Sequence, residues 1–128
     1  MKFKTLMVIK AIVCLGFGIL LLAVPDKLIS LFGAVLSDGG MFTAREYGAA
    51  MFGIMFLCWF AKSADESETK RAIILALFVY NLLGLIVTTL TIMAGVLNAL
   101  GWLIVFVYLF FTLGYGYFLF KPNTDSNA

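Results

Sequence analysis

Three polar residues inside long apolar stretches of the sequence are the first candidates for a chemical role. Arg45 and Glu46 are adjacent near the start of one apolar stretch, and Asn81 lies in the middle of another. An inward guanidinium group suits the carboxylate or head group of an anionic amphiphile, and Glu46 could pair with it or bind a cation. The Asn81 amide should seek a partner across the bundle, and either Tyr108 or Thr112 could serve by depth. We therefore take Arg45, Glu46 and Asn81 as candidate ligand-binding residues. The structural alternative is that Arg45 and Glu46 reach the membrane interface and that Asn81 holds two helices together by a hydrogen bond.

The residue types that are missing narrow the chemistry further. The chain has no His, which removes the usual ligand of haem, catalytic zinc and copper and the commonest general base. Cys14 and Cys58 are far apart and form no CxxC pair, so we interpret both as small apolar residues. Glu46 beside Tyr47 is a poor catalytic pair without a second acid, a metal site or a cofactor motif. We expect no catalytic residue, no metal and no cofactor, and hence a protein that is not an enzyme.

The composition places these residues in a membrane protein. Of the 128 residues, 63% are hydrophobic and 12% are charged, whereas soluble domains carry about a quarter charged residues. The net charge of +2 leaves no basic surface for nucleic acid.

Four stretches are long enough to cross a bilayer, which takes about 20 mainly apolar residues. They cover residues 6–24, 42–61, 72–94 and 99–120. The sequence therefore predicts an all-α membrane protein, a single domain over residues 1–128, with four transmembrane helices in an antiparallel bundle. Lys10 is expected to snorkel to the surface. Because neighbours on a helix point about 100° apart, at least one of Arg45 and Glu46 should face the bundle.

The connection between the first two spans, from Pro25 to Thr43, has its own pattern. Apolar residues recur there at helical spacing: Leu28, Ile29, Leu31, Phe32, Val35 and Leu36. This pattern predicts a short amphipathic helix in the membrane interface, ended by Gly39 and Gly40. It could act as a lid over a cavity or as a docking surface for a partner, or it could be a connector resting on lipid.

The distribution of Lys and Arg predicts the orientation. Seven lie on the side of the two termini and the middle loop, Lys10 included, and two lie on the opposite side. Because cytoplasmic loops carry the excess of Lys and Arg, both termini are expected in the cytoplasm.

The layout resembles that of DoxX-like bacterial membrane proteins. The likeness rests on Gly16, Gly18 and Pro25 in and after the first span, on Leu31-Phe32-Gly33, on Arg45 followed by Gly48-Ala49-Ala50, and on Trp102. The resemblance implies a four-helix bundle in the bacterial inner membrane. Some members of this family are linked to thiol-redox complexes, whereas this chain has no paired Cys.

The expected function follows from these observations. We expect a non-enzymatic inner-membrane protein that acts as an accessory or lipid-binding subunit in an oligomer or a larger membrane complex. Its expected partners are membrane lipid and further copies or other membrane subunits, which would cover an aromatic surface of Phe3, Phe106, Phe110, Phe111, Phe118 and Phe120. The alternative is an oligomeric transporter or channel for a small amphiphile or ion that uses Arg45, Glu46 and Asn81.

Overall fold

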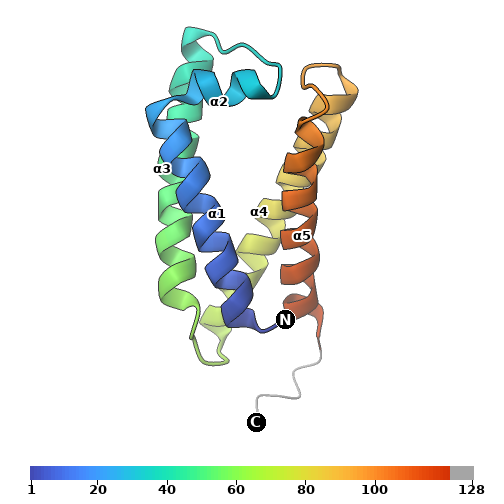
Figure 1. Ribbon diagram of the computed structural model, residues 1–128. Helices are drawn as coiled ribbons and strands as arrows, with labels where there is room; N and C mark the ends of the chain where they lie inside the picture. The colour runs from blue at the N-terminus through green and yellow to red at the C-terminus, as the bar shows by residue number, and fades with distance from the viewer. Residues whose placement is uncertain (122–128) are drawn as a thin grey trace.

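The computed structural model describes residues 1–121 and contains five α-helices and no strand within that range. They are α1 (Phe3–Ala23), α2 (Pro25–Leu31), α3 (Asp38–Ala61), α4 (Glu68–Met93) and α5 (Gly101–Phe120), shown in Figure 1. The predicted all-helical class is confirmed. The last seven residues of the predicted domain lie outside the described part of the chain.

Three of the helices, α1, α4 and α5, are long and apolar enough to cross a membrane. The prediction of a membrane protein with transmembrane helices is confirmed to that extent. The stretch predicted as the second span forms α3, whose 24 residues include Arg45 and Glu46. These charged side chains lower its mean hydropathy, and α3 is not among the helices that qualify as spans.

The four long helices are arranged as two pairs. Helix α1 packs mainly on α3, and α4 packs mainly on α5, as Figure 1 shows. In the first pair the backbones approach closely where Gly18 lies opposite Gly48, because a Cβ on Gly48 would lie only 3.1 Å from the Gly18 carbonyl oxygen. Contacts between the two pairs depend mostly on side chains.

The short helix predicted between the first two spans exists but is shorter than expected. Helix α2 ends at Leu31, and Gly33 follows with a φ of 86°, a left-handed conformation that favours glycine. The prediction that Gly39 and Gly40 end this helix is wrong. Both lie in the first turn of α3, because the Ser37 side chain accepts a hydrogen bond of 3.0 Å from the Gly40 N–H and so caps α3.

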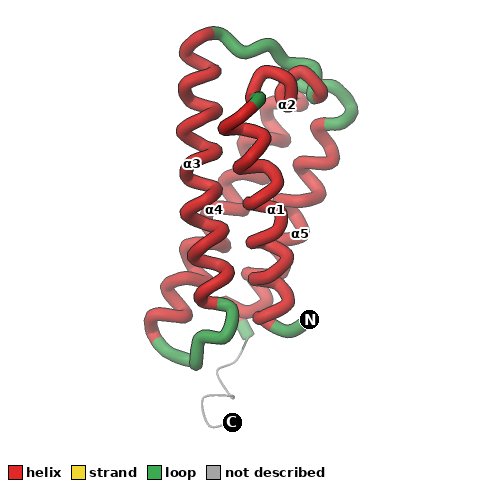
Figure 2. Tube along the Cα trace, turned by 60° about the vertical axis from the view of Figure 1, so that its left-hand side comes forward, coloured by secondary structure: helices red, strands yellow, loops and turns green. Residues whose placement is uncertain are grey.

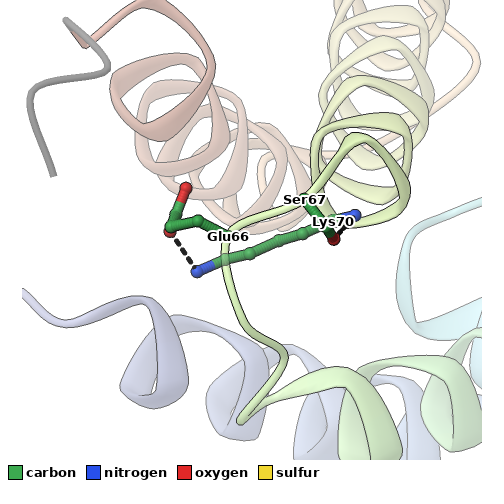
Figure 3. A network of polar contacts seen from close by, with 3 residues as sticks. All are labelled: Glu66, Ser67 and Lys70. Atoms are coloured by element: carbon green, nitrogen blue, oxygen red, sulfur yellow. Dashed lines mark hydrogen bonds and ion pairs between the residues drawn. The ribbon is translucent and has the colours of Figure 1, made fainter. Parts of the chain in front are cut away.

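The connection between α3 and α4 is fixed by polar contacts at the end of the molecule where the N-terminus lies. Ser67 caps α4 by accepting a hydrogen bond from the Lys70 N–H at 3.1 Å, and the Lys70 ammonium forms a 2.6 Å ion pair with Glu66 (Figure 3). The same ammonium lies 4.4 Å from the centre of the Phe3 ring. The cap explains why α4 begins at Glu68, before the apolar stretch predicted from residue 72.

Part of the predicted aromatic surface is interior. Phe3, Phe111 and Phe118 are buried in a core that joins α1, α4 and α5, whereas Phe106, Phe110 and Phe120 are exposed. Every face of these helices is apolar, so hydropathy does not show which rings point inward. Cys14 and Cys58 are both buried with free thiols, as their interpretation as small apolar residues requires.

Candidate functional site

A buried lysine lies between the two helix pairs. Lys10 belongs to a stripe on α1 that repeats every three or four residues and faces the interior, and its exposed fraction is 2%. Its Nζ donates a hydrogen bond of 2.8 Å to Oδ1 of Asn81 in α4. The expectation that Lys10 snorkels is therefore wrong, because its position on the stripe directs it inward.

The surroundings of the Lys10 ammonium are polar or aromatic but carry no negative charge. Its Nζ lies 4.8 Å from the centre of the Tyr80 ring and 4.4 Å from that of Phe111, both within cation–π range. Within residues 1–121 every acidic residue is exposed: Asp26, Asp38, Glu46, Asp65, Glu66 and Glu68. The Lys10 amino group therefore has only neutral partners and no carboxylate partner in this part of the chain.

Asn81 is oriented by its own helix. Its Nδ2 donates to the Leu77 carbonyl at 2.7 Å, which leaves Oδ1 to accept from Lys10. Asn81 is fully buried. Neither of the partners considered from the sequence bonds to Asn81: the Thr112 hydroxyl donates to the carbonyl of Tyr108 on its own helix, and the Tyr108 hydroxyl bonds to that of Tyr47.

Three tyrosine hydroxyls form a hydrogen-bonded chain next to this pair. The Tyr47 hydroxyl of α3 lies 2.5 Å from that of Tyr80 in α4 and 2.7 Å from that of Tyr108 in α5. Three hydroxyls carry three protons, and the two bonds of the chain use two of them. One O–H therefore remains to donate to another acceptor.

A glycine on α4 makes room for one of these rings. A Cβ on Gly84 would collide with the side chain of Tyr108. The missing side chain thus lets the Tyr108 ring lie across α4, where its hydroxyl reaches Tyr47.

Lys10 and the three tyrosines line a cavity of about 120 Å³ between the helix pairs. The remaining lining side chains from the long helices are apolar: Val13, Phe17, Leu21, Met51, Ile104 and Val107. The cavity thus combines a group of hydrogen-bond donors with apolar walls, which is the usual composition of a small-molecule site.

Helix α2 closes one side of this cavity. Its residues Leu28 and Ile29, with Phe32 just beyond its end, contribute apolar side chains to the lining. Of the interpretations proposed for this segment, its position supports that of a lid over a cavity. Figures 1 and 2 show α2 and the α4–α5 connection at the end opposite the N-terminus.

The lid is held by Asn98 from the α4–α5 connection. The Asn98 backbone N–H donates to the Phe32 carbonyl at 2.7 Å, and its Nδ2 donates to the Leu31 carbonyl at 2.9 Å. These bonds satisfy carbonyls at the end of α2 that have no partner within that helix.

Arg45 and Glu46 lie elsewhere. Both side chains are exposed, and neither lines the cavity. The expectation that at least one of them faces the bundle is wrong, because Ala44, Tyr47 and Gly48 occupy the inward face of this turn of α3. Of the three predicted site residues, only Asn81 belongs to the polar group beside the cavity.

The sequence contains a weak signal for the residues that were missed. Lys10 is the single charged residue within the first apolar stretch, and Tyr80 precedes Asn81 directly.

In residues 1–121 no group of three or more His, Cys, Asp or Glu could hold a metal ion. Comparisons with protein-family models, with curated proteins and with solved structures find no match.

Proposed function

We propose that this chain is a non-enzymatic integral protein of the bacterial inner membrane that binds an amphiphile in the cavity between its helix pairs. The observation that carries the proposal is the cavity itself, where one lysine and three tyrosines face apolar walls. An amphiphile complements such a site, because its polar group meets the donors while its hydrocarbon part meets the walls. The resemblance to DoxX-like proteins supports only the location in the bacterial inner membrane.

The proposal includes α3 as a fourth membrane-spanning helix. At about 1.5 Å per residue, its 24 residues extend about 36 Å, more than the roughly 30 Å of a hydrocarbon core. Arg45 and Glu46 lie in its first turns, where long charged side chains reach the interface. With four spans both termini lie on one side of the membrane, and we propose that this side is the cytoplasm.

We further propose that the chain works as an accessory subunit with membrane lipid, other copies or other membrane proteins as partners. Large aromatic side chains remain exposed on the outside of the helices, among them Phe56, Phe60 and Phe106. Lipid chains or the helices of another subunit would cover them equally well.

Native mass spectrometry of the protein purified in mild detergent tests amphiphile binding. We expect a bound small amphiphile on the original chain and its loss from a Val107→Trp variant, because the indole fills the cavity. A Val87→Trp variant is the matched control, since Val87 is 61% exposed. An adduct that persists equally in both variants contradicts the proposal.

A further inference from the structure

We propose that the ligand of the cavity is a single-chain amphiphile with a carboxylate head, such as a fatty acid, and that Lys10 binds this carboxylate. The inference rests on the proposed function and specifies the chemical class of the ligand. It is carried by the unbalanced charge of Lys10, the surplus of hydrogen-bond donors and the size of the cavity.

Lys10 is buried in the interior of the protein. An ammonium removed from water is costly unless it is paired, yet its partners here are an amide oxygen and the faces of two rings. The acidic residues of the described chain are all exposed and do not line the cavity. A ligand anion would therefore supply the negative charge that the protein does not.

The donor count points to the same kind of head group. An ammonium has three N–H donors, of which Lys10 uses one on Asn81, and the tyrosine chain has one O–H to spare. Two N–H groups of the ammonium and one phenolic O–H at this end of the cavity are thus left to donate to a ligand. A carboxylate has two oxygens and accepts only, so it matches a site that offers donors from both the lysine and a tyrosine.

The size of the cavity favours one chain over two. At about 120 Å³ it is smaller than the roughly 150 Å³ cavity that takes up benzene in another protein. It therefore holds a compact head and the first few carbon atoms, but not the head group of a two-chain phospholipid. The lining residues Val13, Phe17 and Ile104 are half-buried, so the rest of an alkyl chain can leave between them toward lipid.

Competition binding with the full chain in a non-ionic detergent tests the inference. Radiolabelled dodecanoate is the probe, and unlabelled dodecanoate, methyl dodecanoate and dodecanol are the competitors. We expect dodecanoate to compete at a concentration at least about tenfold lower than the two neutral compounds, because they lose the charge-assisted bond to Lys10. Lys10→Met should abolish this preference, whereas Lys27→Met on the exposed face of the lid should retain it.

A second variant keeps the test independent of how well Lys10→Met folds. Asn81→Asp has nearly the same shape and places a carboxylate next to the Lys10 ammonium, so it should weaken dodecanoate binding by about tenfold or more. Methyl dodecanoate should bind this variant as it binds the original chain. Equal affinity for dodecanoate in both chains overturns the role of Lys10.

The outcomes separate this inference from the proposed function. Equal competition by all three compounds, with binding lost in Val107→Trp, overturns the carboxylate assignment and leaves amphiphile binding intact. Failure of all three compounds to bind overturns both. Dodecyl phosphate is added as a fourth competitor, and stronger competition by it than by dodecanoate assigns the site to a phosphate head group and also overturns the carboxylate assignment.

Discussion

The ammonium of Lys10 in α1 donates a 2.8 Å hydrogen bond to the side-chain oxygen of Asn81 in α4, and this bond joins the two helix pairs. Asn81 can accept it because its Nδ2 donates to the Leu77 carbonyl, which leaves Oδ1 to face Lys10. The two residues are 71 positions apart in the sequence, so the contact forms only when the pairs come together. It therefore couples the docking of the pairs to the formation of the polar end of the cavity.

We predict that Asn81→Leu destabilises the protein more than Lys10→Met does. The first substitution leaves a buried ammonium without its hydrogen bond, which costs about 1–3 kcal/mol, whereas the second leaves only a neutral amide oxygen unpaired. Unfolding by a denaturing detergent, followed by circular dichroism, measures both.

The double variant Lys10→Met with Asn81→Leu is the control. It removes both partners, so it should lose less stability than the sum of the single variants. If the stability lost in the double variant equals the sum of the losses in the single variants, the bond does not stabilise the packing of the two helix pairs.

Gly84→Ala should lower stability by about 1–3 kcal/mol, because the added methyl collides with the Tyr108 ring and forces it to move. The displaced ring also loses the hydrogen bond between Tyr108 and Tyr47, so amphiphile binding should weaken. Gly53→Ala is the matched control, since a Cβ there meets no atom within 4 Å. Similar melting temperatures for the two variants would contradict the role of Gly84.

Gly33→Ala should loosen the lid. Gly33 has a φ of 86°, and a Cβ there would lie 3.1 Å from the Cβ of Asn98. The substitution therefore combines backbone strain with a tight steric contact against Asn98, which holds the lid. Gly95 has a φ of 79° but open space around it, and Gly95→Ala therefore shows the strain alone, about 1 kcal/mol. We expect faster hydrogen exchange in α2 for Gly33→Ala only. Equal rates of hydrogen exchange in α2 of the two variants would show that Gly33 has no specific effect on the lid.

The sequence predicts the helices better than the site. Length and hydropathy are sufficient to locate α1, α4 and α5, because about 20 consecutive apolar residues have few alternatives to a membrane helix. The end of α2 at Gly33 and the cap of α3 at Ser37 depend on local hydrogen bonds and on one backbone conformation. Because hydropathy does not show these features, the predicted end of the short helix at Gly39 and Gly40 is wrong.

The site depends on which face of each helix turns inward. In a soluble helix, polar residues mark the face that turns outward. In α1 almost every residue is apolar, so the spacing of the apolar residues does not show which face turns inward. The sequence therefore predicts Lys10 at the interface and Arg45 as a candidate ligand-binding residue, whereas Lys10 is buried and Arg45 is exposed. Asn81 could be predicted as buried because an amide avoids lipid, whereas its partner on another helix could not.

Arg45→Met should leave dodecanoate binding unchanged within about twofold, because Arg45 does not line the cavity. The alternative hypothesis of an oligomeric transporter predicts instead that this variant abolishes flux in proteoliposomes. Flux carried by the original chain and lost in Arg45→Met would favour the transporter. Weaker binding in Arg45→Met would place this residue in the ligand site after all.

Reporter fusions distinguish four spans from three. If only α1, α4 and α5 cross the membrane, the termini lie on opposite sides; if α3 also crosses, they lie on the same side. Removing the buried Lys10 from the count leaves six Lys and Arg on the side of the termini and two on the other, Lys27 and Arg45, so the bias persists. We therefore expect alkaline phosphatase to be inactive when fused after Ala128 and active when inserted beside Ser37. Green fluorescent protein at the same sites is the reciprocal control.

An insertion beside Asp65, between α3 and α4, should behave like the Ala128 fusion. Phosphatase activity at this insertion would show that α3 does not span the membrane.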